Sequence, residues 1–172
     1  MEIKEVDRVV ASTLYSQHHY LGSVRGDTHF GAYYAGNLVA TCSFGSFSRN
    51  QQTKKYAGAK ELTRFCVDPS YRAKNLGSKF LSTCLKMLRK PVVTYADTTQ
   101  GHDGALYKAC NFILSHTVEP DYFYIDGGGW VMHKRTLWGR ASKMSMSESE
   151  YAAKHGMVKK YGGEKLCFTH GL

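Results

Sequence analysis

The 172-residue sequence lacks long apolar runs, internal repeats and low-complexity linkers. No stretch approaches the roughly 18 consecutive apolar residues of a membrane-spanning helix. The start is charged and has no apolar run behind it, so we expect no secretory signal peptide. The 5 cysteines are odd in number and none are spaced as CxxC, which argues against a disulfide framework or a zinc knuckle. We therefore expect reduced, mostly buried cysteines in a protein of the cytoplasm.

Acidic residues are also scarce relative to basic ones. The chain carries 23 Lys and Arg against 14 Asp and Glu, a net charge of +9. Residues 1–130 hold 15 basic and 11 acidic side chains, whereas residues 131–172 hold 8 and 3. This balance is typical of proteins whose partners are polyanions, namely nucleic acids, nucleotide cofactors or acidic membranes. The basic C-terminal segment is predicted to be an electrostatic docking segment, with a solvated terminal helix as the alternative.

What is present suffices for one folded domain. Hydrophobic residues make up 42% of the chain, enough to build a core, and the length fits a single domain. We expect that domain to span residues 1–172 and to include residues 138–172 as a basic C-terminal extension.

Strand and helix patterns alternate along the chain. The predicted strands are 3–6, two strands within 30–47 joined by a turn at 35–37, 61–67, 92–95, 112–115, 122–125 and 130–134. The predicted helices are 7–21 with Asp7 as N-cap, 75–89, 104–110 and 147–154. Residues 48–59 are predicted to be a surface loop, and the rest of the C-terminal segment is expected to be irregular. This order predicts an α+β, or α/β layered, domain with a mixed sheet.

The connection between residues 67 and 78 joins a predicted strand to a predicted helix. A turn there can direct successive backbone N–H groups at an anion, and the helix N-terminus adds partial positive charge. Arg72 and Lys74 supply full charges, Gly77 lets a phosphate approach the backbone, and Asn75 tolerates the left-handed conformation. Ser78 could cap the helix or contact the ligand. An ordinary strand-to-helix connection is the alternative.

This loop resembles the acyl-CoA pyrophosphate loop of the GNAT acetyltransferase superfamily, whose usual form is Arg/Gln-x-x-Gly-x-Gly/Ala. Here it reads Arg72-x-x-Asn75-x-Gly77, so the first glycine is replaced. Residues 104–112 resemble the GNAT helix whose tyrosine protonates the departing CoA thiolate, and Tyr107 occupies that place, with a packed tyrosine as the alternative. The resemblance implies a GNAT-like fold with a central, mostly antiparallel mixed sheet, and an acyl-CoA-like donor. The implied cofactor-binding residues are Arg72, Lys74, Asn75, Gly77 and Ser78.

A longer pattern resembles the phage Mom family more closely. It combines His19-Tyr20, Glu61-Leu62-x-Arg64, the run from 95 to 112, and the turn at 126–127 leading to 133–137. Mom proteins are phage enzymes with a GNAT-like fold that add a carbamoylmethyl-type group to the exocyclic N6 of adenine in DNA. The modification shields phage DNA from host restriction. The resemblance implies a phage-encoded transferase of the host cytoplasm, with double-stranded DNA as its substrate.

Adenine N6 is a poor nucleophile because its lone pair is delocalised into the ring, so the reaction needs an activated donor and removal of a proton. Asp97 ends a predicted buried strand, where its carboxylate could orient or accept the N6 hydrogens; a helix cap or turn is its alternative role. His19 can act as a base, and Tyr20 can donate, stack or ligate a metal. Arg64 lies in a half-buried strand and needs an anionic partner, either Asp97 or a cofactor anion. The catalytic candidates are Asp97, His19, Tyr20, Arg64 and Tyr107, with His18 and His102 as runners-up.

The donor is left open, because direct acyl transfer from acetyl-CoA does not give an alkylated amine. An iron ion held by His19, Tyr20 and Asp97 is a further hypothesis, since nitrogen and oxygen ligands suit iron. A base in a duplex must be flipped out before it reacts, and aromatic side chains could stack on it or wedge the duplex open. The candidates are Tyr33, Tyr34, Tyr122, Tyr124 and Trp130.

Two other functions fit parts of the sequence. A conventional GNAT N-acetyltransferase would use acetyl-CoA to acetylate a small-molecule or protein amine. A non-catalytic, basic nucleic-acid-binding protein would depend on neither Asp97 nor His19. We expect no membrane partner, and the chain is compatible with a homodimer.

Overall fold

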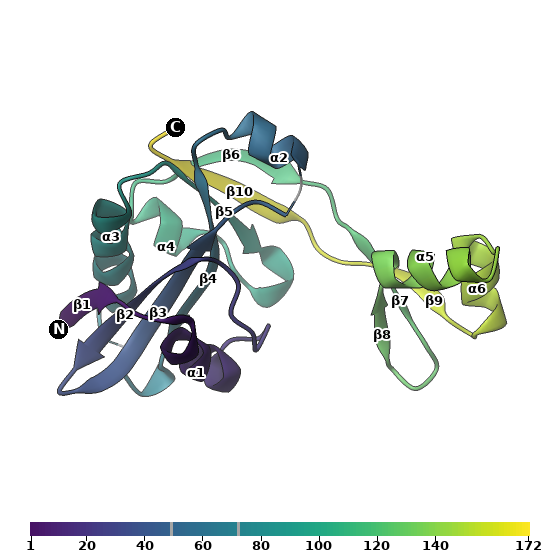
Figure 1. The fold of residues 1–172 in the computed structure, drawn as a ribbon, viewed down its shortest axis with the longest axis horizontal. Helices are drawn as coiled ribbons and strands as arrows, with labels where there is room; N and C mark the ends of the chain where they lie inside the picture. Colours follow the sequence, from purple (N-terminus) through teal and green to yellow (C-terminus); the bar gives the residue numbers. More distant parts are fainter. Residues whose placement is uncertain (49, 72) are drawn as a thin grey trace. The chain divides into compact units, whose positions relative to one another are not determined.

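A computed structural model describes residues 1–48, 50–71 and 73–172 of the protein. The chain divides into two compact units, which we call unit 1 and unit 2 (Figure 1). Unit 1 comprises Met1–Ala96, Asp103–His116 and Leu166–Leu172, and unit 2 comprises Asp97–His102 and Thr117–Lys165. Each unit has a hydrophobic core of its own. The single domain expected for the whole chain stays a prediction.

Unit 1 is built on a seven-stranded sheet. Its strands are β1 (Glu2–Glu5), β2 (Thr28–Tyr34), β3 (Asn37–Gly45), β4 (Lys60–Val67), β5 (Val92–Asp97), β6 (Ile113–Val118) and β10 (Lys165–His170). The strand order is β1-β2-β3-β4-β5-β10-β6. Strands β1 to β4 pair antiparallel in succession, and β4 pairs parallel with β5. Ala35 and Gly36, both at positive φ, form the tight turn between β2 and β3.

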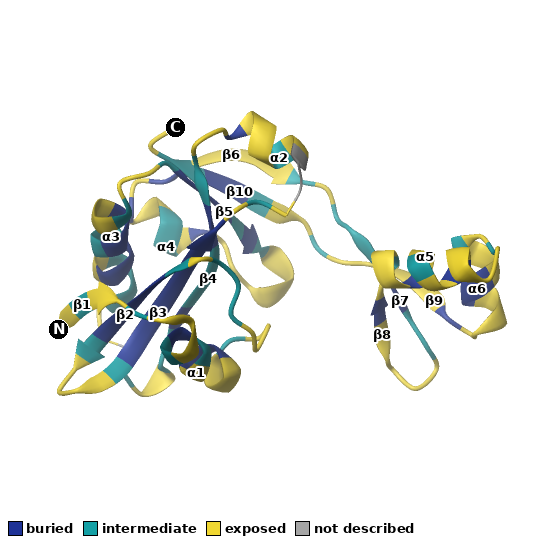
Figure 2. Ribbon diagram, in the orientation of Figure 1, coloured by how far each residue is buried: buried dark blue, intermediate teal, exposed yellow. Residues whose placement is uncertain are grey.

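Helices cover both faces of this sheet. They are α1 (Arg8–His18), α2 (Asn50–Lys55), the single turn η1 (Pro69–Tyr71), α3 (Leu76–Leu88) and α4 (Ala105–Lys108). Helix α3 packs Phe80 and Leu81 into the main core beside Phe65 of β4, whereas α1 packs Tyr15 against Cys66. Because successive side chains of a strand point to opposite faces, α3 and α1 lie on opposite sides of β4. Figure 2 shows the buried strands between these helices.

Unit 2 is a small three-stranded sheet packed against two helices. Its elements are the turn η2 (Thr98–Gln100), β7 (Tyr122–Ile125), β8 (Val131–His133), α5 (Lys134–Lys143), α6 (Glu148–Lys154) and β9 (Val158–Tyr161). The strand order is β8-β7-β9, and both pairs are antiparallel. Tyr124, Met132 and Leu137 lie at the centre of its core. Ser147 and Glu150 form a reciprocal capping box that begins α6.

The predicted fold class, α+β (α/β layered) with a GNAT-like, mostly antiparallel central sheet flanked by helices, is confirmed. Asp7 caps α1 by accepting the N–H of Val10 at 2.8 Å, as predicted. Two local predictions are wrong. Residues 48–59 contain a helix, α2, and the C-terminal segment forms α5, β9 and β10 in addition to the predicted helix. Strand β10 lies between β5 and β6, a position set by contacts distant in sequence that no local pattern reports.

Two glycines at similar backbone angles test how closely unit 1 is packed. Gly104 precedes α4 with φ 78°, and a Cβ there would lie 2.2 Å from Cζ of Phe168. Gly36 has φ 81° and nothing within 4 Å of its Cβ position. We expect Gly36→Ala to cost about 1 kcal/mol of unfolding free energy through backbone strain, and Gly104→Ala about 2–4 kcal/mol because a core ring must also move. Urea denaturation measures both losses, and equal losses would contradict this account.

Candidate active site

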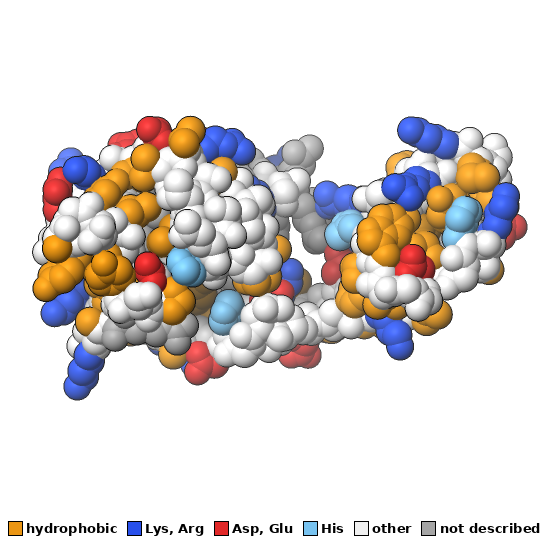
Figure 3. All heavy atoms as spheres, turned by 90° about the horizontal axis from the view of Figure 1, so that it is seen from below, with side chains coloured by type: hydrophobic (Ala, Val, Ile, Leu, Met, Phe, Trp, Pro, Cys, Tyr) orange, Lys and Arg blue, Asp and Glu red, His pale blue; other side chains and the backbone are white. Residues whose placement is uncertain are grey.

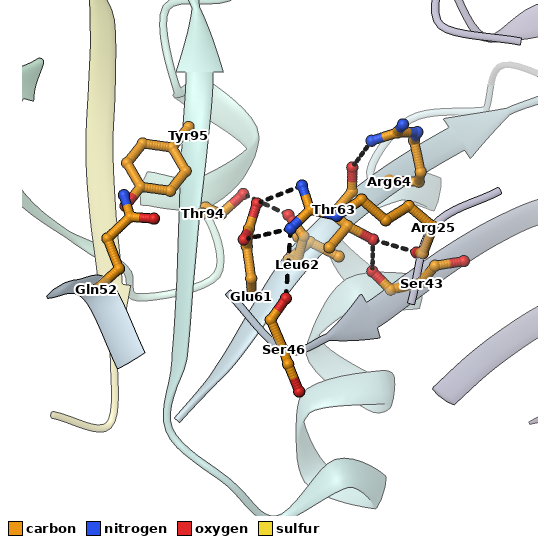
Figure 4. Close-up of polar contacts among 10 residues, drawn as sticks. All are labelled: Arg25, Ser43, Ser46, Gln52, Glu61, Leu62, Thr63, Arg64, Thr94 and Tyr95. Carbon is orange, nitrogen blue, oxygen red and sulfur yellow. Dashed lines mark hydrogen bonds and ion pairs between the residues drawn. The ribbon is translucent and has the colours of Figure 1, made fainter. Parts of the chain in front are cut away.

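Strands β4 and β5 pair over two residues and then part, forming a fork. The parallel ladder joins Lys60 to Val92 and Glu61 to Val93, and within the described residues it extends no further. Just beyond the ladder, Thr94 Oγ1 donates across the gap to the carbonyl of Leu62 at 3.3 Å (Figure 4). Since both strands continue past this point, the fork leaves backbone groups that are not paired between them. A ligand in the fork could bind these groups.

A β-bulge in β4 lies at the same place. The β3–β4 register pairs Ser43 with Arg64 and Phe44 with Leu62, so Thr63 is the extra residue. The Thr63 hydroxyl is hydrogen-bonded to the carbonyls of Ser43, at 3.0 Å, and of Arg25. A bulge bends and twists its strand, and bulges are over-represented beside active sites. The bulge at Thr63 therefore helps β4 to diverge from β5.

Arg64 binds backbone carbonyl groups rather than a carboxylate. Its Nε donates to the carbonyl of Ser23 at 2.8 Å, and its Nη1 donates to the carbonyl of Thr63 at 2.6 Å. Partial burial lowers the pKa of Arg64, and the neighbouring Arg25 lowers it further, but a guanidinium remains charged at neutral pH. Arg64 thereby fastens the chain that follows His19 and Tyr20 onto β4.

Two ion pairs hold the rest of this segment, residues 23–27, along β4. Arg25 Nη2 lies 3.1 Å from Glu61 Oε2, and Lys60 Nζ lies 2.7 Å from Asp27 Oδ1 (Figure 4 shows the first). Glu61 is only 8% exposed, so the first pair places a desolvated carboxylate at the base of the fork. Neither Glu61 nor Arg25 was among the predicted site residues. In the sequence, Glu61 could have been noticed as a lone acidic residue in a predicted strand with an apolar pattern.

His19 and Tyr20 follow the end of α1. Their rings are stacked with centroids 4.8 Å apart, and the ring of Tyr15 meets His19 edge-on at 5.7 Å. His19 Nδ1 accepts the N–H of Leu21 at 3.1 Å. Because Nδ1 is an acceptor, the neutral imidazole carries its proton on Nε2. In this arrangement His19 can donate a proton or hydrogen bond from Nε2, whereas action as a base would require Nδ1 to release Leu21.

A buried polar chain anchors this end of α1 to the sheet. Tyr15 Oη lies 2.8 Å from Ser43 Oγ, which lies 2.7 Å from His29 Nδ1. Burial raises the pKa of Tyr15 and lowers the pKa of His29, so both side chains are neutral at pH 7. The chain fixes Tyr15, on which His19 rests.

Tyr107 approaches the fork from the α3 side of the sheet. It lies on α4 and packs between the rings of Phe112 and Phe168, at centroid distances of 5.6 and 5.5 Å. Burial raises the pKa of Tyr107, an effect that the neighbouring hydroxyl of Thr94 partly offsets. Tyr107 is therefore a neutral phenol that can donate a proton near the fork.

The predicted cofactor residues surround the N-terminus of α3. Asn75 is left-handed, with φ 63°, and its side chain does not cap the helix. Lys74 and Lys79 line a cavity of about 540 Å³, and Asn75, Ser78 and Lys79 line a neighbouring hollow of about 730 Å³. Gly77 has an ordinary negative φ and packs closely beside β4, so its role here is compactness rather than backbone freedom. The predicted Arg72 lies outside the described residues.

Asp97 is the last residue of β5 and belongs to unit 2. Its Oδ1 accepts the N–H of Thr99 at 3.1 Å and also the Thr99 hydroxyl, so it caps η2. Its Oδ2 lies 3.8 Å from Lys165 Nζ, and the side chain is 18% exposed. The capping role weighed as the alternative for Asp97 is thus present, and it uses Oδ1, whereas Oδ2 is the oxygen that lies near Lys165. The catalytic role stays a prediction.

Comparison with known protein families identifies the family of this chain. A profile described as the Mom protein family matches residues 1–168. The chain belongs to the Mom protein family. No curated protein matches it.

Solved structures similar to this Mom family chain are acetyltransferases with little sequence identity. An IAA acetyltransferase from Bacillus cereus is 10% identical with a TM-score of 0.58, covering 99% of both chains. The ribosomal-protein-S18-alanine N-acetyltransferase from Escherichia coli is 12% identical with a TM-score of 0.57, covering 98% of this chain and 91% of its own. A GNAT family acetyltransferase from Elizabethkingia anophelis, solved with acetyl-CoA bound, is 11% identical with a TM-score of 0.53, covering 99% and 97%. These likenesses show that the Mom family protein has a GNAT-like fold.

The folded Mom family protein distributes its charge differently from the linear sequence. Unit 1 carries 15 basic and 7 acidic side chains, and unit 2 carries 8 and 7. Four acidic residues that precede the basic C-terminal segment lie in unit 2 with it, namely Asp97, Glu119, Asp121 and Asp126, and Asp121 pairs with Lys134. In the face drawn in Figure 3, blue and red side chains are interspersed over unit 2. The net positive charge therefore resides mainly in unit 1.

The aromatic candidates for stacking on a base differ in exposure. Tyr34 is 59% exposed and Trp130 is 51% exposed, so both can meet a partner. Tyr124 is buried in the core of unit 2, and its hydroxyl donates to Glu148 at 3.2 Å. Tyr122 donates to the same carboxylate at 2.9 Å. Burial makes Tyr124 unsuitable for stacking on a base.

Residues 1–48, 50–71 and 73–172 contain neither a grouped set of metal ligands nor a helix that could span a membrane. No three His, Cys, Asp or Glu side chains in these ranges are grouped as metal ligands. The iron hypothesis therefore gains no support from the geometry. No helix in the same ranges is long and apolar enough to span a bilayer.

Replacement of Arg64 tests whether its hydrogen bonds hold the chain after Tyr20 against β4. Lysine keeps the charge but cannot donate from two nitrogens, so Arg64→Lys should loosen residues 19–27. Loss of one charge-assisted hydrogen bond, about 1.5 kcal/mol, predicts amide hydrogen exchange about tenfold faster there. Hydrogen-exchange mass spectrometry measures this, with the exposed Arg89→Lys as the matched control. Unchanged protection in the Arg64 variant would show that other contacts hold the segment.

The Lys60–Asp27 pair predicts a pH dependence. A hydrogen bond from Lys60 holds the pKa of Asp27 below its usual value. A lowered folded-state pKa contributes stability above the unfolded value of about 4, and this contribution is lost as the pH falls through the folded value. Asp27→Asn should therefore lower the Tm at pH 7, and its cost should shrink below about pH 4 and vanish once Asp27 of the parent is protonated. Thermal unfolding across pH measures this, with exposed Glu119→Gln as control. A cost that does not change with pH would refute the ion-pair account.

Proposed function

We propose that this Mom family protein is a transferase that adds a carbamoylmethyl-type group to adenine N6 in double-stranded DNA, protecting the DNA from host restriction in the host cytoplasm. The observation that carries the proposal is the fork between β4 and β5, with Tyr107 on one side of the sheet and a polar cluster on the other. The polar cluster comprises Arg25, Gln52, Glu61, Arg64 and Tyr95.

An acyl-CoA-like donor fits the residues around the fork. The parted strands offer backbone hydrogen-bonding groups to an extended chain, and the uncapped first turn of α3 offers N–H groups to phosphate. Lys74, Asn75, Gly77 and Ser78 would hold the phosphates, with Arg72 as the proposed additional cation. A carbamoylmethyl-type group carried on the sulfur of such a donor would be attacked by N6 at its CH2 carbon, so that the N–C bond forms as the C–S bond breaks and a thiolate leaves; attack at a thioester carbonyl would give an amide instead. Tyr107, kept neutral by burial, is the proton donor that we assign to that thiolate.

The acceptor amine must lose a proton as the new bond forms. We assign Asp97 to orient or accept the N6 hydrogens, through the oxygen that does not cap η2. Tyr20, 53% exposed, is suited to stack on an extruded base, and His19 can donate from Nε2. Arg64 acts by positioning the chain that follows these two residues.

DNA docking is assigned mainly to unit 1, because that unit carries most of the net positive charge. Tyr34 and Trp130 are exposed enough to stack on or wedge between bases. This assignment replaces the C-terminal segment as the principal docking surface. A homodimer remains compatible with the proposal.

A conventional N-acetyltransferase is the second candidate function. The same fork would serve acetyl-CoA, and a structure of similar fold is described with acetyl-CoA bound. In that case the acceptor would be a small-molecule or protein amine, and DNA would be unchanged.

Nucleoside analysis separates the two candidates. The chain is expressed in bacteria, total DNA is digested to nucleosides, and modified deoxyadenosine is measured by mass spectrometry. We expect a modified deoxyadenosine with the parent chain, its loss with Asp97→Asn, and a decrease of about 100-fold with Tyr107→Phe, since general acid catalysis contributes about 10²–10⁴-fold. Glu119→Gln, an exposed acid, is the control and should behave as the parent.

Each outcome tests a different part of the proposal. Unmodified DNA with soluble, folded parent protein would overturn the proposed function. Full activity of Asp97→Asn would remove Asp97 from the mechanism while leaving the function standing. Circular dichroism of each variant shows whether loss of activity reflects loss of fold.

A further inference from the structure

A row of three polar side chains lies beside the fork. Gln52 on α2 donates from Nε2 to the hydroxyl of Tyr95 on β5 at 2.7 Å (Figure 4). The phenol of Tyr95 lies beside the thiol of Cys167 on β10, which is fully buried, and the two groups affect each other's pKa. Tyr56, which follows α2, also reaches this sulfur, at 3.8 Å. Helix α2 is thus held to the sheet by polar contacts as well as by packing.

The contact with Tyr95 fixes which way the Gln52 amide points. The Tyr95 hydroxyl oxygen accepts from the amide nitrogen of Gln52, which leaves the one hydroxyl proton for the neighbouring Cys167 sulfur. The amide nitrogen therefore faces Tyr95, and the carbonyl oxygen is left for another partner. Within the described residues, Oε1 and the second N–H of Gln52 have no hydrogen-bond partner. Gln52 thus presents a free acceptor and a free donor side by side, in a fixed order.

The position of this amide matches the acceptor side of the fork. Tyr95 follows Thr94, the residue that bridges the fork, and the two side chains point to opposite faces of β5. Thr94 faces Tyr107, so Tyr95 and Gln52 lie on the other face. Glu61 is close enough to Tyr95 to raise the pKa of its phenol, although burial contributes more. Gln52 is half-buried, so part of the residue is accessible to a ligand.

We propose that Gln52 reads the target base, accepting from N6–H of adenine at Oε1 and donating its free N–H to N7, with Tyr95 as a positioning residue. A glutamine amide is the side chain that pairs with these two atoms of adenine. Guanine and thymine present a carbonyl oxygen in place of the amino group, and cytosine has carbon in place of N7, so each loses at least one bond. This inference rests on the proposed function, because it names how that site selects its base.

Binding to single-stranded oligonucleotides tests the proposal without any donor. Fluorescence anisotropy at fixed salt compares oligodeoxyadenylate with its 7-deazaadenine counterpart, which lacks the N7 acceptor. We expect the parent to bind the 7-deaza strand about tenfold more weakly, within the range of one base contact. Gln52→Ala should bind both strands equally and weakly. Gln51→Ala, one position away on the same helix and exposed, should behave as the parent. Equal binding of both strands by the parent would overturn the proposal.

Nucleoside profiles in cells distinguish failure of this inference from failure of the proposed function. With the parent chain, we expect modified deoxyadenosine alone. Gln52→Ala should lower its yield about tenfold or more and raise the share of other modified nucleosides. Tyr95→Phe frees the amide to rotate, so it should lower selectivity between bases while the Gln51→Ala control keeps it. Absence of any modification by the parent overturns the proposed function, whereas parental yield and selectivity in Gln52→Ala overturn only the reading role.

Discussion

The divergence of β4 from β5 is the constraint on which the rest of this structure depends. Two residue pairs join the strands, and a bulge at Thr63 bends one away from the other. A sheet with an unpaired gap at its centre is costly unless other groups bind the exposed backbone. Here a threonine hydroxyl bridges the gap, and helices cover both faces of the sheet. The opening is thus stabilised by its surroundings, which makes it a lasting feature that a ligand can enter without breaking the sheet.

Polar side chains of β4, rather than apolar ones, hold the neighbouring chain segment in place. Lys60, Glu61, Thr63 and Arg64 each contact the segment 23–27 that crosses them. Such contacts are directional, so they both bind the segment to β4 and fix its position along the strand. An apolar contact of equal area would allow the segment to slide. The cluster at the fork is therefore arranged by the same strand whose bulge helps to open it.

Local patterns predicted the elements whose causes are local. Asp7 caps α1, the turn at Ala35 and Gly36 closes a hairpin, and apolar spacing marks α3, because each depends on neighbours a few residues away. The position of β10 depends on β5 and β6, which lie far earlier in the sequence, so no local window of sequence reveals it.

The same distinction applies to the candidate site. Single residues such as His19 and Tyr107 were found because a family pattern marked them. The Glu61–Arg25 and Gln52–Tyr95 pairs join residues 36 and 43 positions apart, and only the folded chain brings them together. The charge of the basic C-terminal segment is offset for a similar reason, because Asp97, Glu119, Asp121 and Asp126 lie in the same unit as that segment.

All five cysteines of the chain are buried. Burial raises the pKa of Cys42, Cys110 and Cys167, and raises that of Cys66 to about 11. Peroxides and mixed disulfides attack exposed thiolates, and these four groups are neither exposed nor ionised at neutral pH. The fold is thus largely insulated from the redox state of its surroundings. It needs neither a reductant to protect its thiols nor an oxidant to complete a disulfide.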